Sequence, residues 1–186
     1  MTLIVRSSKI DDIDSILRIK SDPKVACRQY QVDQTAYSEM LRRVLGGDNK
    51  TEIFTTQYST IEKDGESIGY VRHDHYEVDG GKMVSCAWNL ISSHWGQGIM
   101  KFSLTQLLNE WILGTEVQHV FADHFRGNER CKRLLDRLVF VSQEIPLLER
   151  LTTAYQQRSL HWVVRRRLDA STWKGVSSEQ LQQADR

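Results

Sequence analysis

The chain has 186 residues with 25 basic and 24 acidic side chains, which gives a formal net charge of +1. A nucleic-acid-binding domain usually has a clear basic excess, so this balance disfavours that class. No apolar run approaches the roughly 18 to 20 residues that cross a bilayer, and the N-terminus lacks the pattern of a signal peptide. Three widely separated cysteines, Cys27, Cys86 and Cys131, argue against a disulfide framework. We therefore expect a cytoplasmic protein.

The N-terminal part of the chain predicts one strand and two helices. Residues 2–6 are rich in β-favouring side chains and predict the first strand. Asp11 is the predicted N-cap of a helix with apolar residues at helical spacing, and Pro23 is expected to mark its end. A second helix is predicted over residues 34–45, because its apolar residues form one stripe and Gly46 follows it.

The middle of the chain has the composition of β-strands. Strands are predicted over residues 52–62, 67–78 and 82–91. The segments between them, 63–66 and 79–81, contain glycine where a tight turn needs a positive φ. These three strands are expected to form an antiparallel meander.

The C-terminal half alternates helices and strands. A loop over residues 92–98 leads into a predicted helix, and a strand over 117–125 and a second helix over 128–138 follow. The chain from 140 to 168 contains two further β-rich segments, of which 159–167 is the clearer.

This order of elements predicts one domain over residues 1–168, followed by a polar C-terminal tail over 169–186 that is either loose or forms one short helix. The predicted fold class is α/β, an α+β arrangement in which a mixed sheet has helices on both faces.

The loop before the first C-terminal helix has the features of an anion site. A helix N-terminus presents backbone N–H groups and a partial positive charge. Gly96 and Gly98 remove side chains that would obstruct a phosphate, and Lys101 adds a cation. A plain tight turn is the alternative for this short pattern. The amides expected to surround a diphosphate belong to Gln97, Gly98, Ile99 and Met100.

Segment 92–100, with its Trp95-Gly96-Gln97-Gly98 core, resembles the acetyl-CoA pyrophosphate loop of the GNAT superfamily of N-acetyltransferases. Its form is similar to that of the branch with the ribosomal-protein N-terminal acetyltransferases. Asn128 to Cys131 and Leu138 to Phe140 occupy the places of that branch's next helix, and 67–71 looks like its Ile-Gly strand. The resemblance covers roughly residues 2–168. The chain departs from the pattern at Met100, at Val139 and at Leu135, which replaces a frequent tyrosine.

The resemblance implies a GNAT-like fold with a mostly antiparallel sheet and a splayed central pair of strands. It also implies acetyl-CoA as the co-substrate and direct attack by a primary amine of a peptide or protein N-terminus or a small molecule. Asn128 would bond the pantetheine arm and Cys131 would pack near the thiol, although a helix N-cap and a small buried side chain are the alternatives. The implied cofactor-binding residues are Asn89, Leu90 and Ile91 through their amides, Trp95, Gly96, Gln97, Gly98, Ile99, Met100, Lys101, Asn128 and Cys131.

The general base is predicted only loosely. His73 and His75 lie two residues apart on a strand, hence on one face, and are the candidate catalytic residues. Ordinary strand histidines and an ordered water relay are the alternatives. A zinc site with His119 or His124 lacks a third ligand at a diagnostic spacing, so no metal is expected.

Two functional readings follow from these residues. The first is an acetyl-CoA-dependent N-acetyltransferase, and the second is a non-catalytic GNAT-fold protein that binds acyl-CoA or a partner. The departures at Met100, Leu135 and Val139 favour the second. A third reading, nucleic-acid binding, rests only on the three arginines 165–167, for which a solvated strand end is the alternative. A homodimer is left open.

Overall fold

The computed structural model describes residues 2–27, 33–145 and 163–176, and its centre is one mixed sheet of seven strands. The strands lie in the order β1-β2-β3-β4-β5-β7-β6, and all neighbours are antiparallel except the pair β4 and β5. The strands are β1 (Leu3–Ser7), β2 (Phe54–Lys63), β3 (Glu66–Val78), β4 (Gly81–Leu90), β5 (His119–Phe125), β6 (Val141–Gln143) and β7 (Val163–Asp169).

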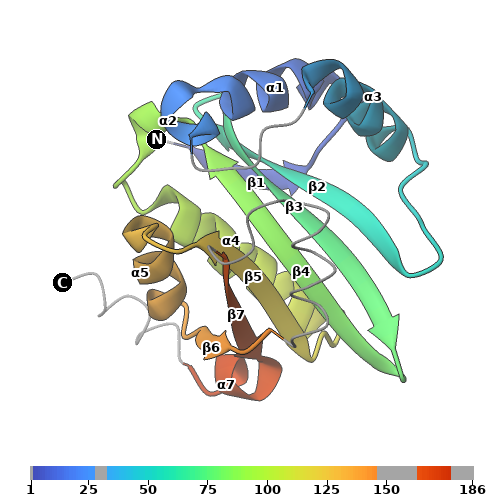
Figure 1. Cartoon of the computed structure of the whole chain (residues 1–186), viewed down its shortest axis with the longest axis vertical. Coiled ribbons are helices and arrows are strands. Elements are labelled where there is room, and N and C mark those ends of the chain that lie inside the picture. The colour runs from blue at the N-terminus through green and yellow to red at the C-terminus, as the bar shows by residue number, and fades with distance from the viewer. Residues whose placement is uncertain (1, 28–32, 146–162, 177–186) are drawn as a thin grey trace.

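Helices cover both faces of this sheet (Figure 1). One face carries α1 (Ile13–Ser21), α2 (Pro23–Ala26) and α3 (Gln34–Leu45), and the other carries α4 (Ile99–Asn109) and α5 (Glu129–Arg137). A π-helical turn, Glu110–Gly114, extends α4, and α7 (Ala170–Lys174) follows β7. The larger apolar core lies between the sheet and α4 and α5, and a smaller one lies under α1 and α3. The predicted fold class is confirmed. Among the helices in the described ranges, none has the length and apolar character needed to span a bilayer.

The two hairpins β2–β3 and β3–β4 close as their turn residues predict. Asp64 and Gly65 have φ values of 51° and 86°, and Asp79 and Gly80 have 50° and 76°. Two consecutive residues with positive φ form the tight turn whose twist matches that of paired strands. Local turn chemistry therefore sets the register of the meander.

The strands β4 and β5 diverge along half of their length. They pair from Met83 opposite His119 to Cys86 opposite Ala122, and residues 87–90 and 123–125 do not pair with one another. Beyond the last pair, β4 stays bonded to β3 and β5 stays bonded to β7. Each strand therefore keeps one paired edge, while its other edge is not paired with the neighbouring strand, which is the splayed pair that the resemblance implied.

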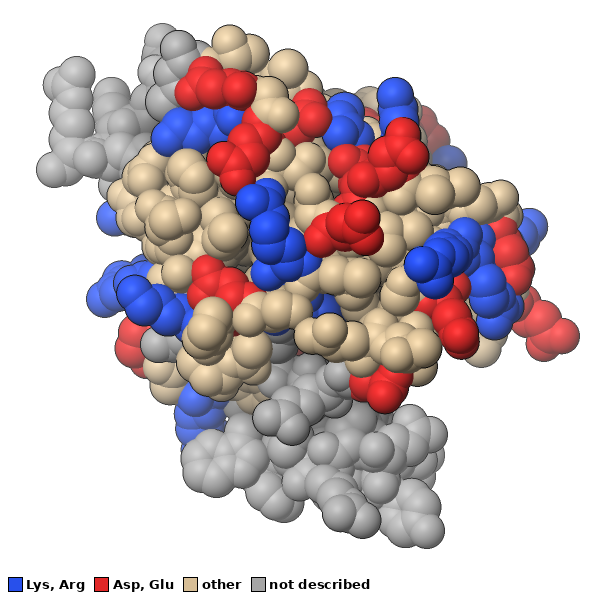
Figure 2. Space-filling model, turned by 90° about the horizontal axis from the view of Figure 1, so that it is seen from above, with Lys and Arg blue, Asp and Glu red and all other residues tan. Residues whose placement is uncertain are grey.

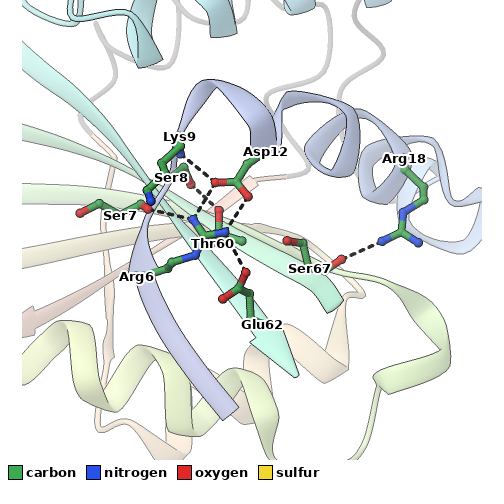
Figure 3. A network of polar contacts seen from close by, with 9 residues as sticks. All are labelled: Arg6, Ser7, Ser8, Lys9, Asp12, Arg18, Thr60, Glu62 and Ser67. Atoms are coloured by element: carbon green, nitrogen blue, oxygen red, sulfur yellow. Dashed lines mark hydrogen bonds and ion pairs between the residues drawn. The ribbon is translucent and has the colours of Figure 1, made fainter. Parts of the chain in front are cut away.

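The start of the first helix differs from the prediction of Asp11 as N-cap. The helix α1 begins at Ile13, after a 3-10 turn over Ile10–Asp12, and its N-cap residue is Asp12. The Asp12 side chain accepts a hydrogen bond from the Lys9 amide at 2.7 Å and two from the Arg6 guanidinium at 2.7 and 2.8 Å (Figure 3). The pairing of buried Asp12 with Arg6 therefore fixes where the helix begins. The spacing of residues in the sequence did not reveal this pair.

The predicted end of the first helix is close to the observed one. The helix α1 ends at Ser21, and Pro23 stands at the first position of α2. Proline is tolerated there because its missing N–H would have no helical partner.

The predicted polar tail contributes to the core where it is described. Residues Ala170–Lys174 form α7, one of the two predicted alternatives. The Trp173 side chain is buried, and its Nε1 donates a hydrogen bond to Asn109 Oδ1 at 2.9 Å. The compact fold therefore extends past residue 168. The part of the tail from residue 177 lies outside the described residues, as do the first four residues of the strand predicted over 159–167.

The C-terminal end of α5 is held in the conformation that normally requires glycine. Val139 has a φ of 56°, which is uncommon for a β-branched residue. Its amide donates to Asp136 O at 3.1 Å, and the Phe140 amide donates to Leu135 O at 2.9 Å. This pair of bonds is a Schellman motif, whose left-handed position is usually glycine. The valine is therefore strained at one of the positions where the chain departs from the family pattern.

We expect Val139→Gly to be more stable than Val139→Ala by about 1 kcal/mol, because only alanine keeps the left-handed strain. Urea denaturation of both variants measures the difference. At Arg133, an exposed position inside α5, the order should be reversed, since glycine costs about 1 kcal/mol relative to alanine in a helix interior. An alanine variant at 139 as stable as the glycine variant would contradict the strain argument.

Candidate active site

The turn before α4 is open in the way an anion site requires. Gly96 and Gly98 have φ values of 80° and 74°, and a Cβ atom built at either would meet no atom within 4 Å. The first backbone hydrogen bond of α4 runs from the Phe102 amide to the Gly98 carbonyl at 3.0 Å. The amides that precede Phe102 at the start of the helix therefore make no hydrogen bond within it. Both Gly96 and Gly98 have the positive φ that glycine adopts without strain. The same residues leave the end of the helix dipole uncovered.

Side chains on both sides of the splay hold this turn in place. Trp95 Nε1 donates to Leu90 O at 2.7 Å, and the Arg130 guanidinium of α5 lies 4.5 Å from the centre of the Trp95 ring. Gln97 Oε1 accepts a hydrogen bond from Lys63 Nζ at 3.0 Å. The side chains of Trp95 and Gln97 therefore fix the loop, and binding of a cofactor by these residues stays a prediction.

Asp22 connects the loop to the helices on the opposite face of the sheet. Its Oδ2 accepts from the Ser92 amide at 2.8 Å, and its Oδ1 accepts from the Lys24 amide at 2.9 Å. Burial would raise the pKa of Asp22, but the hydrogen bonds from Ser92 and Lys24 lower it below the ordinary value. The carboxylate thus joins the α1–α2 junction to the start of the glycine-containing loop before α4. Residue type and local spacing give no signal for Asp22, because the contact spans 70 positions.

The residues that depart from the family pattern lie in the larger core. The Met100 side chain is buried there, in the first turn of α4. Leu135 is fully buried in α5 and provides no hydroxyl group. At the position of Leu135, α5 therefore presents an apolar packing surface to the larger core.

The register of β4 reduces the set of backbone amides that can face the splay. The Ile91 amide already donates to Ile68 O at 2.9 Å. Because bonding partners alternate along an antiparallel pair, the Asn89 amide also points toward β3, and those of Leu90 and Trp88 point toward β5. Of the three amides predicted to contact a thioester, only that of Leu90 has the required direction. Backbone amides point to alternate sides along a strand, and this was the signal available in the sequence. The prediction of three successive amides did not take it into account.

Asn128 and Cys131 stand together at the start of α5. Asn128 Oδ1 accepts a hydrogen bond from the Cys131 amide at 3.3 Å, so the asparagine caps the helix as its structural alternative predicted. Burial raises the pKa of the Cys131 thiol to about 12. The thiol is therefore protonated at neutral pH, which makes it a poor nucleophile. Contact of either residue with a cofactor stays a prediction.

The predicted histidine pair faces α4. His73 Nδ1 lies 2.7 Å from His75 Nε2, and His73 Nε2 lies 3.1 Å from Ser59 Oγ. The His73 ring is 5.0 Å from the ring of Trp111 and is buried. Burial, assisted by His75, lowers the pKa of His73 to about 3, so the ring is neutral at pH 7. Both ring nitrogens of His73 have protein partners, and a catalytic role for either histidine stays a prediction.

The opposite face of the sheet carries a group of phenols that the sequence did not single out. Tyr37 Oη lies 3.3 Å from Tyr58 Oη, and Asn89 Nδ2 donates to Tyr70 Oη at 2.7 Å. Burial raises the pKa of Tyr70 well above its ordinary value, so its hydroxyl group stays neutral. Lys20 Nζ lies 4.6 Å from the centre of the Tyr37 ring. We call Lys20, Tyr37, Tyr58, Tyr70 and Asn89 the tyrosine cluster. The three tyrosines have the same pattern in the sequence as ordinary core aromatics.

The three arginines of β7 have protein partners. Arg165 pairs with Asp123 at 3.0 Å, Arg166 contacts Asp136, and Arg167 pairs with Asp169 at 3.0 Å. Figure 2 shows acidic and basic side chains interspersed on the face seen from above. The three ion pairs favour the structural reading of the arginine run. Within the described ranges, no group of three His, Cys, Asp or Glu side chains could hold a metal ion.

Solved acetyltransferase structures share this fold. Ribosomal-protein-S5-alanine acetyltransferase from Vibrio fischeri is 14% identical with a TM-score of 0.71, and the match covers 93% of this chain and 96% of that one. A dodecameric spermidine N-acetyltransferase from Vibrio cholerae is 12% identical with a TM-score of 0.69, again over 93% and 96%. A GNAT-family acetyltransferase from Bacillus anthracis is 10% identical with a TM-score of 0.66, over 92% and 96%.

No significant match was found among curated protein sequences. The family model described as the acetyltransferase (GNAT) domain matches residues 2–141, which is most of the chain and includes the splay, the glycine turn and α5. The chain therefore belongs to the GNAT acetyltransferase family.

Proposed function

We propose that the chain transfers the acetyl group of acetyl-CoA to a primary amine by direct attack. The observation that carries the proposal is the open turn at Gly96 and Gly98, which lies at the end of β4 where that strand has left β5. An N-terminal helix turn is suited to a diphosphate, and the facing edges of two splayed strands offer hydrogen bonds to an extended arm. These two features occur side by side, as binding of acetyl-CoA requires.

The reaction needs no covalent enzyme intermediate. The amine nitrogen bonds to the thioester carbon, the C–S bond breaks, and the amine proton leaves while the sulfur departs as the thiolate of CoA, which is then protonated. The amide of Leu90 faces away from β3 toward β5, and we propose that it bonds the thioester oxygen as negative charge develops there. The protonated Cys131 thiol agrees with direct transfer. A water chain is the proposed route for the amine proton, because His73 and His75 pack against Trp111 on the face opposite to the tyrosine cluster.

The acceptor is proposed to approach from the face of α1 and α3. The tyrosine cluster lies there, next to the splayed end of β4, with Asn89 as its member on that strand. The related structures named above act on a ribosomal-protein alanine and on spermidine. Both acceptors offer a primary amine, and we propose an acceptor of this class for this chain in the cytoplasm.

A panel assay tests the proposal. Calorimetric titration with acetyl-CoA should show binding below about 1 mM, the upper range of ordinary Michaelis constants. Release of the CoA thiol should then depend on an added amine, with polyamines and N-terminal peptides as the first candidates. Failure to bind acetyl-CoA at millimolar concentration would overturn the proposal.

Binding without turnover on any acceptor would instead favour a second candidate function, a non-catalytic acyl-CoA-binding protein. The specific observation in its favour is the apolar, fully buried Leu135 at the place of the family's frequent tyrosine acid.

A further inference from the structure

A histidine that the proposed chemistry does not use projects from the splayed part of β5. His124 lies two residues past Ala122, the last residue of β5 that pairs with β4, and opposite Val164 on β7. Side chains alternate along a strand, so its ring lies on the same face as Val120 and Ala122, the face of α4 and α5. Only 7% of the residue is exposed. The ring is therefore buried on the part of β5 that has diverged from β4.

One ring nitrogen of His124 is bonded and the other is not. Nδ1 lies 3.0 Å from the carbonyl oxygen of Phe125. A carbonyl can only accept, so Nδ1 carries the hydrogen, and in the neutral ring Nε2 is left with a lone pair. Nε2 is buried and has no hydrogen-bond partner among the residues that the structure describes. A buried polar atom without a partner costs free energy, and such atoms are rare in folded proteins.

We propose that His124 Nε2 accepts a hydrogen bond from an amide N–H of the pantetheine arm of acyl-CoA. This inference rests on the proposed function, because that arm must run through the splay between the glycine turn and the thioester. Its amide N–H groups lose their water there and need acceptors. His124 is a positioning residue in this scheme. The incoming amine approaches from the face of the tyrosine cluster, whereas the imidazole lies on the face of α4 and α5.

The sequence offered no signal for this role. His124 belongs to no motif, and its neighbours Asp123 and Phe125 alternate with it in the manner of any strand. The divergence of β4 from β5, together with the bond to the Phe125 carbonyl, distinguishes it from an ordinary strand histidine.

Two variants and two ligands test the proposal. His124→Phe keeps the ring shape and removes the acceptor, whereas His124→Gln keeps an acceptor oxygen. Calorimetry compares CoA with 3′-phosphoadenosine 5′-diphosphate, which retains the diphosphate and lacks the arm. We expect His124→Phe to weaken CoA binding about tenfold and to leave the fragment unaffected, with His124→Gln closer to wild type. His119 is a partly exposed histidine at the paired end of β5, and the control variant His119→Gln should change neither affinity.

Equal weakening of both ligands by His124→Phe, or no weakening of CoA, would overturn the inference. Wild type that binds neither ligand would overturn the proposed function as well, so the two failures are distinguishable. If His124→Phe does not fold, nitrogen NMR of the wild-type imidazole decides the matter. The Nε2 resonance should move on addition of CoA and stay fixed on addition of the fragment, and an unchanged resonance with bound CoA would contradict the proposal.

Discussion

Replacing Gly98 by leucine is expected to abolish measurable binding of acetyl-CoA while the chain stays folded. A Cβ atom at this position meets nothing within 4 Å, so a larger side chain projects into the open space above the first amides of α4. The φ of 74° adds a strain of about 1–2 kcal/mol for any L-residue. The loss of affinity should exceed about 100-fold, because the side chain occupies the proposed position of the diphosphate. Calorimetry and thermal melting measure the two effects separately.

Gly80→Leu is the matched control for that variant. Gly80 has a φ of 76° and equally open surroundings, but it lies in the β3–β4 turn, at the opposite end of β4 from the glycine loop. Both variants should therefore lose a similar amount of stability, and only Gly98→Leu should lose acetyl-CoA binding. If the two variants bind equally well, the glycine turn is not the diphosphate site.

Asp12→Ala is expected to lower the free energy of unfolding by about 3 kcal/mol. Asp12 is 5% exposed, and its carboxylate accepts two bonds from Arg6 and one from the Lys9 amide. Its removal leaves the partly buried guanidinium with Glu62 as its ionic partner and the Ser7 carbonyl as a further acceptor. Burial would raise the pKa of Asp12, but the bonds from Arg6 and Lys9 lower it below the ordinary value. Its stabilising contribution is thus complete above the unfolded pKa and is lost as the pH falls toward the folded one.

Glu66→Ala provides the contrast for Asp12→Ala. Glu66 pairs with Arg18 at 2.9 Å, but both side chains are about half exposed, and such pairs contribute roughly 0–1 kcal/mol. Urea denaturation at pH 7 of both variants should show a clear difference in midpoint. Equal midpoints would mean that the Arg6–Asp12 pair does not hold β1 against the start of α1, as Figure 3 depicts it.

Local sequence determined the features that depend on a few neighbouring residues. The meander followed from its two Asp-Gly turns, because positive φ at both turn positions fixes the strand pairing. The glycine turn before α4 and the Asn128 cap were predictable for the same reason, since each acts on amides within three residues. The helices followed from apolar periodicity, and the motif spacing over segment 92–140 indicated the family that the domain model then matched.

Only the tertiary structure decided which of these residues can face a ligand. The direction of the β4 amides depends on the register with β3, and the divergence appears only in the pairing of β4 with β5, two strands that are remote in sequence. Asp22 reaches Ser92 through a contact between segments 70 residues apart, and the free nitrogen of His124 matters because of that divergence. Burial and partner choice arise from segments remote in sequence, so residue type and spacing along one segment contain no record of them.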